Sequence, residues 1–212
     1  MTAACGAWGA VIKRHIAKWN RAAAGLESVG VGVERRYGHL KRELFGKARG
    51  ETLLVAAGTG LDFQHLPEGL RVSAVDFSPV MLGYAKPRAK EYRGALRLVR
   101  GDMQRLSFRD ASFDSVVTAC TFCSVPDPLQ GLRELHRVLR PGGRLLMFEH
   151  VRAGNPLLGF FMDVMTPFSS FFGPDMNRRT GETVQQAGFT IERQFNVYLD
   201  VVKIFECVKK LP

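Results

Sequence analysis

The sequence predicts an α/β fold, a doubly wound and mostly parallel sheet of seven strands that ends in a C-terminal antiparallel hairpin. Two observations support this fold class. After Gly50, short apolar runs of strand character alternate with helical segments, which is typical of parallel strands joined by right-handed crossovers. Near the C-terminus, two β-rich runs are separated by three residues, and so short a link requires antiparallel pairing.

Five parallel strands are expected in the first part of the domain, which spans residues 50–212. The segment Leu139–Gly143 (LRPGG) supplies a helix stop and a turn before the fifth of them. The predicted strands lie at 52–57, 71–75, 96–99, 113–119 and 143–149. The helices between them are predicted near 60–65, 79–92 and 128–139.

The end of the chain is expected to complete the sheet. Phe189–Val197 and Val201–Lys209 form the predicted hairpin, which raises the number of strands to seven. Residues 151–188 are rich in Phe, Met and Pro. We interpret them as an insertion between the fifth strand and the hairpin.

Residues 1–49 are predicted to form a basic helical cap. From Trp8 to about Ala23, apolar residues recur at the spacing of one helix face, while Lys and Arg occupy the opposite face. The glycine-spaced stretch Gly25 to Gly32 is expected to break this helix before a second basic helix around Glu34–Phe45. The helix over residues 8–23 either docks on its own domain with its charges solvated or lies on an anionic membrane surface.

Positive charge is concentrated at the N-terminus. The 212-residue chain has a formal net charge of +10, and its first 50 residues hold ten Lys and Arg against three Glu. Such an excess indicates an anionic partner, which could be a membrane surface, a nucleic acid or an acidic substrate. No apolar stretch approaches the roughly 20 residues that span a bilayer, and the N-terminus lacks the pattern of a signal peptide. We therefore expect a cytoplasmic protein with peripheral contact at the inner membrane face.

The four cysteines are too few and too scattered for a disulfide framework. Cys120 and Cys123 have the CxxC spacing of zinc and redox sites. A structural zinc site needs about four ligands, and no second Cys or His pair at metal spacing is present in the sequence. Redox pairs usually open a helix, whereas this pair follows an apolar strand and precedes Val125-Pro126. We interpret the two cysteines as small residues at a strand end, and we expect no metal site.

The first strand runs into Gly58-Thr59-Gly60, a turn at which the backbone can approach a ligand closely. Two glycines alone are weak evidence, because many turns contain them. A dinucleotide-binding fingerprint requires a third glycine for close helix packing, and Phe63 stands at that position. The sequence therefore disfavours a pyrophosphate-binding site and, with it, a nicotinamide oxidoreductase.

Polar residues also follow the second and third strands. Asp76 ends the second strand, where a carboxylate can accept hydrogen bonds from both hydroxyls of a ribose. Ser78 can cap the helix that begins at Pro79. Asp102 and Met103 follow the third strand, where they can meet the amino group and the face of an adenine. Because ligands in open α/β sheets bind at the carboxyl ends of the strands, these elements are expected to share one crevice.

Together, these motifs resemble those of a class I S-adenosylmethionine-dependent methyltransferase. The resemblance covers roughly residues 50–150 and rests on VAAGTG, AVDFSP, LVRGDMQRLSF, ASFDSVVTACTFCSVPDP and LHRVLRPGGRLLMFEH. The most similar group contains the ubiquinone and menaquinone C-methyltransferases, with their phospholipid N-methyltransferase and thiol S-methyltransferase relatives. The resemblance implies a Rossmann-like methyltransferase fold and S-adenosylmethionine as the cofactor.

The resemblance also implies which residues surround the cofactor. The Gly58–Gly60 turn would surround the methionine part, and residues 119–121 would lie near the sulfonium. Asp76 would bind the ribose, while Asp102 and Met103 would contact the adenine. The complete expected set is Ala56, Gly58, Thr59, Gly60, Asp76, Phe77, Met81, Asp102, Met103, Ala119 and Cys120.

Two residues depart from the pattern of this family. Leu54 and Ala56 stand where the family usually has an acid and a glycine. Loss of the acid should remove a hydrogen bond directed at the ammonium group of the cofactor or at the residues around it. Ala56 is acceptable in the turn if its φ is negative, although it adds a methyl group to a close-packed loop. We expect weaker cofactor binding rather than none.

Methyl transfer from a sulfonium is an in-line displacement in which positioning supplies much of the acceleration. A base is needed only where the acceptor must lose a proton. His150, after the fifth strand, is the first candidate for that base or for an orienting group; a strand-end histidine bonded to the backbone is the equal alternative. Thr121, which would shape the methyl site, and Tyr37, in the expected lid, complete the predicted catalytic set. His39 and Asp163 are held in reserve.

The predicted function is methyl transfer from S-adenosylmethionine to a small or lipid-like acceptor, a phospholipid amine or a quinone precursor. The apolar insertion 151–188, where this fold has its acceptor cover, and the basic N-terminal helix favour such an acceptor. A thiol S-methyltransferase and a non-catalytic S-adenosylmethionine-binding protein stay open as alternatives. A nucleic-acid methyltransferase would explain the charge, but CTFCSVPDP follows the fourth strand in place of an Asn/Asp-Pro-Pro-aromatic motif.

Overall fold

The computed structural model describes the backbone of residues 2–211 and the side chains of residues 11–171 and 173–211. The strands are β1 (Glu51–Val55), β2 (Arg71–Asp76), β3 (Ala95–Arg100), β4 (Phe113–Ala119), β5 (Leu139–His150), β6 (Phe189–Tyr198) and β7 (Val202–Lys209). The helices are α1 (Thr2–Phe45), the short 3-10 helix η1 (Leu61–His65), α2 (Pro79–Glu91), α3 (Pro128–Val138), α4 (Pro156–Phe172) and α5 (Thr180–Gln186).

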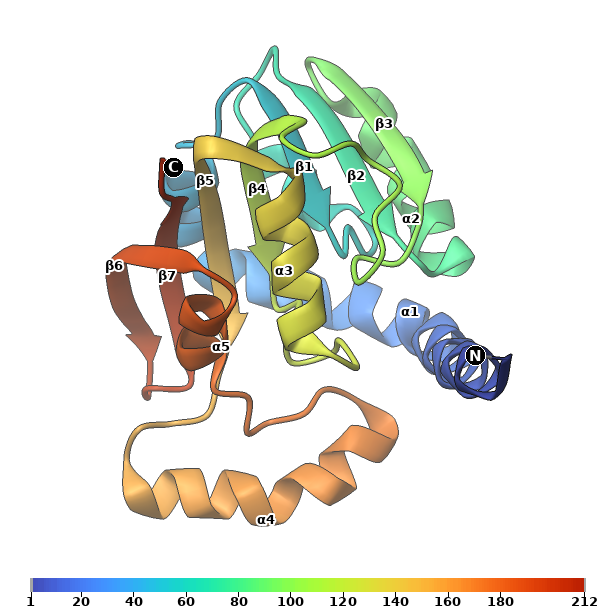
Figure 1. Ribbon diagram of the computed structural model, residues 1–212, viewed down its shortest axis with the longest axis vertical. Helices are drawn as coiled ribbons and strands as arrows, with labels where there is room; N and C mark the ends of the chain where they lie inside the picture. The colour runs from blue at the N-terminus through green and yellow to red at the C-terminus, as the bar shows by residue number, and fades with distance from the viewer. Residues whose placement is uncertain (1, 212) are drawn as a thin grey trace.

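The seven strands form one sheet in the order β3-β2-β1-β4-β5-β7-β6 (Figure 1). Neighbours from β3 to β5 are parallel, and β7 is antiparallel to both β5 and β6. The predicted fold class and the C-terminal hairpin are therefore confirmed. Between β1 and β4 the strand order reverses, and ligands in open α/β sheets bind at the carboxyl ends of the strands at such a point.

Both faces of the sheet are covered, because alternate residues of the inner strands point to opposite sides. In β1, Leu53 and Val55 belong to a core that includes Leu135 of α3. Leu54 points the other way, into a core that Phe45 closes at the end of α1. Figure 1 shows α3 and α5 over one face of the sheet and α1 and α2 over the other.

β5 begins at residue 139 rather than at the predicted 143. The segment Leu139–Gly143, which is expected to form a turn, belongs to this strand. Leu139 pairs with Phe113 of β4, and pairing resumes at Arg144 after a shift in register. The turn residues thus form an irregularity inside the strand, with Gly142 in the left-handed region at φ 74°. Pairing with β4 and the burial of Leu139 override the local turn signal.

The expected break at residues 25–32 is wrong, since α1 continues through this stretch without interruption. A glycine costs a helix about 1 kcal/mol relative to alanine, but contacts with the domain hold the stretch. A Cβ at Gly30 would lie 2.3 Å from Leu61 Cδ1, so the glycine lets α1 approach η1 closely. Glu27 pairs with Arg88 of α2. Gly30 therefore serves packing rather than a turn.

α1 docks on the domain through the face that the sequence predicts to be apolar. Trp19 and Ala23 are buried and form a small core with Met81 of α2. Lys13 and Arg14, on the basic side, are exposed. Of the two alternatives for residues 8–23, docking on the domain is observed for residues 11–23, whose basic side remains accessible, while the side chains of residues 8–10 lie outside the described ones. Within residues 2–211, no helix is both long enough and apolar enough to cross a bilayer.

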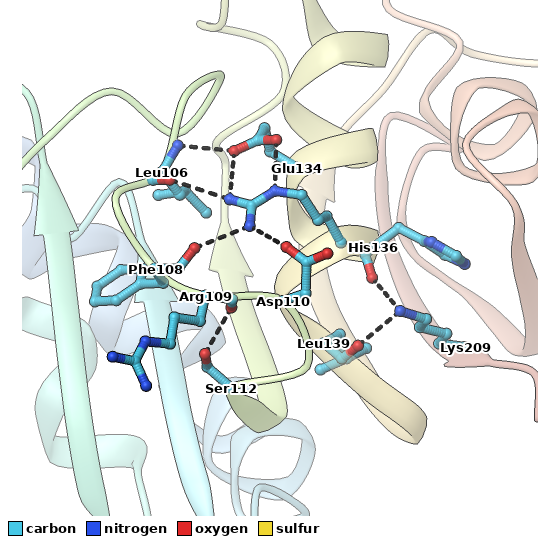
Figure 2. Close-up of polar contacts among 10 residues, drawn as sticks. Leu106, Phe108, Arg109, Asp110, Ser112, Glu134, His136, Leu139 and Lys209 are labelled. Atoms are coloured by element: carbon cyan, nitrogen blue, oxygen red, sulfur yellow. Dashed lines mark hydrogen bonds and ion pairs between the residues drawn. The ribbon is translucent and has the colours of Figure 1, made fainter.

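The loop between β3 and β4 is fastened to α3 by a network of hydrogen bonds (Figure 2). The Arg137 guanidinium binds the Glu134 carboxylate and donates to Asp110 and to the carbonyl oxygens of Leu106 and Phe108. Glu134 in turn accepts a hydrogen bond from the Leu106 N–H at 2.9 Å. Because α3 belongs to the core, this network holds residues 106–110, the later part of the loop, against the domain.

Candidate functional site

A cleft opens at the carboxyl ends of β1, β2 and β4, under α1. It consists of two recesses, which we together call the strand-end cleft. The larger recess encloses about 320 Å³, within the range of about 300–1,000 Å³ that is typical of small-ligand sites. The smaller recess extends toward the loop after β3. Residues shared by both recesses are Ala56, Asp76, Phe77, Thr121 and Ser124.

The turn after β1 is tightly wound. Ala56, Gly58 and Gly60 have positive φ angles of 51°, 55° and 84°. Gly60 also lacks space for a side chain, because a Cβ would lie 2.7 Å from the Phe63 ring and 3.1 Å from the Ala85 Cα. The negative φ under which Ala56 was expected to be acceptable is not found. A non-glycine residue occupies left-handed backbone there, at a cost on the order of 1–2 kcal/mol.

Asp76 ties the turn after β1 to the end of β2. Its Oδ2 accepts a hydrogen bond from the Gly58 N–H, and its Oδ1 accepts one from the Ser78 N–H, both at 2.8 Å. Burial raises the pKa of this carboxyl, and the backbone N–H groups oppose the shift. A carboxylate has about four acceptor positions, so Asp76 retains the capacity to accept hydrogen bonds from a ligand in the cleft.

Ser78 joins α1 and α2 beside this carboxylate. Its hydroxyl oxygen accepts a hydrogen bond from the Met81 N–H at 3.1 Å, which confirms the predicted cap of α2. Its O–H donates to Asn20 Oδ1 of α1 at 2.6 Å. The N-terminal helix is therefore hydrogen bonded to the domain next to the ligand-facing end of β2.

The smaller recess ends at the loop after β3. Asp102 Oδ1 accepts hydrogen bonds from the backbone and side-chain N–H groups of Gln104, both at 2.9 Å. Gln104 Oε1 accepts one from the Asp127 N–H at 2.8 Å, which joins this loop to the start of α3. Met103 is buried, and a Cβ on Gly131 would lie 3.1 Å from its Cε. The two residues predicted to contact the adenine are thus held in place, Asp102 by its hydrogen bonds with Gln104 and Met103 by packing against Gly131.

A buried carboxylate holds the loop after β4. Glu149 Oε2 accepts hydrogen bonds from the N–H groups of Thr121 at 2.9 Å and Phe122 at 3.1 Å, and Oε1 accepts one from the Thr118 hydroxyl at 2.7 Å. Burial raises the pKa of Glu149 to about 7, although these three hydrogen bonds oppose the shift. Cys120, in the same loop, has φ 48°. Glu149 therefore stabilises a strained turn at the cleft, a role that sequence analysis did not assign.

The two cysteines of this loop are neutral thiols near pH 7. Cys120 reaches solvent through the cleft that it lines. Burial of the thiol among protein atoms, together with the neighbouring Cys123 and Glu149, raises its pKa well above the ordinary value. Burial raises the pKa of Cys123 to about 12, and its Sγ donates to the Cys120 carbonyl oxygen at 3.2 Å. Because the thiolate is the nucleophilic and metal-binding form, this supports the interpretation of both as small residues at a strand end.

α1 forms the roof of the strand-end cleft. Val29 and Trp19 line the larger recess, while Ile12 and His15 line the smaller one. The His15 Nδ1 is buried without a hydrogen-bond partner among the described residues, and burial lowers the pKa of this ring. His15 is not among the residues predicted from the sequence, although Ile12, His15 and Trp19 stand at the i, i+3 and i+7 spacing of one helix face.

An ion-pair cluster joins α1 to η1 at the edge of the larger recess. The Lys41 ammonium lies 2.6 Å from Glu34 and 2.8 Å from Asp62, and His65 Nε2 contacts the second Glu34 oxygen. Burial acts to lower the pKa of Lys41, but the two carboxylates outweigh it and raise that pKa. Glu34, Asp62 and His65 are residue types that bind metal ions, and their potential ligand atoms lie within 4.8 Å of one another. The positive charge beside Glu34 and Asp62 is the Lys41 ammonium.

The structure brings most of the predicted cofactor residues together. All of them except Gly60, which lies in the turn after β1, line the strand-end cleft. Thr121, from the predicted catalytic set, lines both recesses, and its hydroxyl donates to the Ala119 carbonyl oxygen at 3.3 Å. The cofactor contacts of these residues remain predictions.

The other catalytic candidates lie outside the residues that line the cleft. His150 pairs with Val202 of β7, and burial lowers the pKa of its ring. The ring of Tyr37 packs against Phe148, with 5.7 Å between the centroids. Of the reserve candidates, Asp163 is bound by an arginine and His39 is exposed. The catalytic roles of His150 and Tyr37 stay predictions.

Comparisons with known proteins address the family. Residues 53–147 match the family model described as a methyltransferase domain. The thiol S-methyltransferase TMT1B of Homo sapiens is 34% identical over 173 residues, which cover 73% of this chain and 70% of that protein. The demethylmenaquinone methyltransferase of Deinococcus radiodurans is 38% identical over 108 residues, which cover 50% of this chain and 45% of that protein.

Solved structures agree with these relatives at the level of the fold. A SAM-dependent methyltransferase from Aquifex aeolicus superimposes with a TM-score of 0.61 at 19% sequence identity, covering 81% of this chain and 88% of that one. Similarity at this identity shows the fold alone, whereas the human relative matches over most of both chains. The chain therefore belongs to the S-adenosylmethionine-dependent methyltransferase family that includes these thiol and demethylmenaquinone methyltransferases.

Proposed function

We propose that this methyltransferase transfers the methyl group of S-adenosylmethionine to a small apolar acceptor, and that the accepting group is a thiol. The observation that carries the proposal is the state of the ionisable groups along the strand-end cleft. Among the described residues, each carboxylate lining the cleft already accepts hydrogen bonds from the protein, and both of its cysteines have raised pKa values. Glu34 and Asp62 are paired with Lys41, and the proposal assigns Asp76 and Asp102 to the ribose and the adenine. No carboxylate or thiolate is then left as a base at the site of transfer, and the acceptor has to ionise largely by itself.

A thiol suits such a cleft. A thiol as acidic as that of cysteine, with a pKa of about 8.5, is a few per cent thiolate near pH 7, and the thiolate can attack a sulfonium methyl group without a base. An alkyl ammonium, with a pKa near that of lysine at about 10.4, holds its proton far more tightly. The similarity to a human thiol S-methyltransferase supports the same class of acceptor. The imidazole of His15 is not counted as a base for the acceptor, because it lines the smaller recess, which the proposal assigns to adenine.

The cofactor supplies a methyl group on a sulfonium, and the residues of the chain bind and orient it. The proposal assigns the ribose hydroxyls to Asp76 and the adenine to Asp102 and Met103. The methionine part is assigned to residues 58–60, and the site of transfer to residues 119–121. The support is that these residues line or border one cleft and that the Asp76 carboxylate keeps acceptor positions for two hydroxyls.

The proposed acceptor is apolar because the walls of the larger recess are largely apolar. The apolar side chains contributed by α1 and η1 are Trp19, Leu26, Val29, Val33 and Leu61, beside the charged cluster of Glu34, Lys41 and Asp62 at the edge of the recess. An apolar molecule gains about 25 cal/mol for each Å² that it buries against such side chains. Binding of this kind supplies affinity without a charged group on the acceptor, and it leaves orientation to the loop after β4.

A quinone precursor is the second candidate, favoured by the demethylmenaquinone methyltransferase relative, although this chain covers less than half of that protein. Methylation of a ring carbon needs a base for the ring hydroxyl, and His150 remains the candidate for that role. A phospholipid amine, the other acceptor expected from the sequence, is the third. Neither needs a different cofactor, so one assay can compare all three classes.

We also propose an anionic membrane surface as a partner of residues 8–23, with the protein in the cytoplasm and at the inner membrane face. The exposed basic side chains Lys13, Arg14 and Arg21 support this proposal. The apolar side of the same helix is engaged with the domain, so the contact would be electrostatic. Vesicle binding that is unchanged in a Lys13→Gln, Arg14→Gln variant would contradict it.

The acceptor is tested with S-adenosylmethionine labelled in its methyl group. The purified chain is incubated with thiophenol, phenol, phosphatidylethanolamine or a demethylated menaquinol, and the label is counted in the organic extract. We expect label in the thioether alone. Across thiols of different acidity, the pH at half-maximal kcat/KM should follow the pKa of the acceptor. Transfer to the quinol or the lipid without transfer to the thiol would refute the thiol assignment, and absence of calorimetric binding of S-adenosylmethionine would refute the cofactor site.

A further inference from the structure

α4 exposes its apolar side. A helix that packs on its own domain normally buries such a face. The large apolar side chains concerned are between 57% and 81% exposed and share one face of the helix, namely Leu157, Phe160, Phe161, Val164, Phe168 and Phe171. Figure 1 shows α4 set apart from the sheet at one end of the molecule. The folding of the chain on itself therefore leaves most of the surface of these side chains in contact with solvent.

The polar side of α4 is the side that the protein engages. Asp163 pairs with Arg152, whose Nη2 lies 2.7 Å from the carboxylate. Lys18 of α1 donates to the carbonyl oxygen of Ser170 at 2.7 Å and also to that of Gly173. These contacts fix the middle and the C-terminal end of the helix with its apolar face directed outward.

The remaining polar groups of α4 are satisfied inside the helix. The Thr166 hydroxyl donates to the Met162 carbonyl oxygen at 2.7 Å, and the hydroxyls of Ser169 and Ser170 donate to the Thr166 carbonyl oxygen. Hydroxyls bonded to the preceding turn can enter a medium that offers no water. The only acidic residue of the helix, Asp163, is paired. No described polar group of α4 therefore opposes transfer of the exposed face into an apolar phase.

We propose that the exposed face of α4 docks on an anionic lipid bilayer, with the helix lying in the plane of the interface. The helix has 17 residues and is about 25 Å long. Amphipathic helices bury a face of this kind about 5–10 Å into the boundary between headgroups and acyl chains. Phe and Leu are the apolar residues typical of such helices.

Charge favours an anionic lipid over a neutral one. Arg14 and Arg21 stand four residues before and three residues after Lys18, so they share the face of α1 that reaches α4. Both arginines are exposed, and neither forms an ion pair with a described acidic residue. Basic side chains next to a membrane surface attract anionic headgroups by about 1 kcal/mol each.

Docking in this orientation brings the strand-end cleft to the lipid surface. Pro174, just beyond the end of α4, lines the larger recess, and Lys18, which caps the helix, is next to Trp19 in the roof. An apolar acceptor dissolved in the bilayer could then enter the cleft without crossing water. This route rests on the proposed function, whereas the docking of α4 does not.

The test is sedimentation of the full chain with vesicles, either of phosphatidylcholine alone or of phosphatidylcholine mixed with phosphatidylglycerol. We expect binding to the anionic vesicles that weakens as salt is added. In the Phe160→Ser, Val164→Ser variant, the partition coefficient should fall at least about tenfold, because two apolar side chains no longer enter the lipid. Leu211→Ser, which removes a leucine that is 74% exposed near the opposite end of the chain, is the matched control and should bind like the unchanged protein.

The outcomes separate docking from catalysis. Calorimetry with S-adenosylmethionine should give the same affinity for the α4 variant as for the unchanged protein. Equal vesicle binding of the two would overturn the proposal. So would vesicle binding that is independent of both lipid charge and salt. A dimer in analytical ultracentrifugation that dissociates in the α4 variant, together with no vesicle binding, would show instead that the face pairs with a second copy. Loss of methyl transfer with vesicle binding intact would count against the proposed function alone.

Discussion

Two residues on left-handed backbone border the same cleft, Ala56 after β1 and Cys120 after β4. Each such residue costs on the order of 1–3 kcal/mol and persists only where its surroundings hold it. Around Cys120, the hydrogen bonds from Thr121 and Phe122 to Glu149 do so. Strain of this kind is common where a loop must present its backbone to a ligand. Left-handed strain is thus present in both loops that the proposal places around the methionine part and the sulfonium of the cofactor.

Ala56→Gly should raise the free energy of unfolding by about 0.5–1 kcal/mol. Relief of the left-handed strain, about 1–2 kcal/mol, exceeds the about 0.5–1 kcal/mol by which glycine favours the unfolded chain. Urea denaturation measures the change. Ala111→Gly is the matched control, because Ala111 has φ 50° and lies outside the cleft residues. Both variants should gain stability, but only Ala56→Gly should bind S-adenosylmethionine more tightly. A loss of stability in both would contradict the strain argument.

Asp76→Asn should weaken S-adenosylmethionine binding by about ten- to a hundredfold. An amide replaces one acceptor oxygen by a donor, which then faces the N–H of Gly58 or Ser78 and can no longer accept from a ribose hydroxyl. Hydrogen bonds to a charged group contribute about 1.5–3 kcal/mol. Isothermal titration calorimetry measures the affinity. Asp110→Asn changes a carboxylate outside the cleft and should leave the affinity unchanged; equal affinity of both variants would remove Asp76 from the site.

At the scale of elements, α1 has three kinds of attachment to the domain. Trp19 packs in a small core, Asn20 accepts a hydrogen bond from Ser78, and Lys41 joins the ion-pair cluster with η1. Because the same helix forms the roof of the cleft, its attachments decide how the cofactor enters and leaves. The roof is therefore expected to influence affinity through these contacts and not only through the residues that line the cleft.

Lys41→Met should lower the free energy of unfolding by about 3–5 kcal/mol, since removal of one partner leaves the carboxylates of Glu34 and Asp62 without their cation. Chemical denaturation gives the value. Arg93→Met removes one partner of an exposed pair with Glu68 and should cost less than about 1 kcal/mol. Comparable losses in the two variants would show that the Lys41 cluster behaves like a surface ion pair.

At the scale of the whole molecule, Glu149 should make stability depend on pH. Its pKa is about 7 in the fold and 4.5 in the unfolded chain. Between these values the folded protein binds more protons, so its stability falls as pH rises from about 4.5 to about 7 and changes no further above that window. Asp76, whose pKa is also raised, acts in the same direction. Glu34, with its lowered pKa, contributes stability that is lost as pH falls.

Glu149→Gln isolates this contribution. The glutamine oxygen can accept from the N–H groups of Thr121 and Phe122, and its amide can donate to the Thr118 hydroxyl, so the loop keeps its hydrogen bonds. Relative to the unchanged protein, the variant should be more stable at pH 8 than at pH 5 by an amount on the order of 3 kcal/mol. Urea denaturation at both pH values measures the difference. Parallel stability curves for the two proteins would refute a raised pKa at Glu149.

The sequence predicted the sheet and most of the candidate site because both depend on local signals. Strand β4 was predicted at its observed bounds, since its apolar run is bordered by turns. The three-residue link before Val201 allowed only a hairpin. Asp76 and Asp102 could be assigned to one crevice because each follows a parallel strand, and the carboxyl ends of parallel strands meet at one edge.

What the sequence by itself determined is therefore the order of the elements and the polar residues at the strand ends, because periodicity, turns and caps act over a few residues. Only the tertiary structure decided how α1 and α4 are used. Gly30 lets the continuous helix α1 approach η1 by leaving space for the Leu61 side chain, although the two residues are far apart in sequence. His15 enters the cleft, while Tyr37 packs against β5. Long-range packing settles which face of a helix is buried, and for α4 it leaves the apolar face exposed.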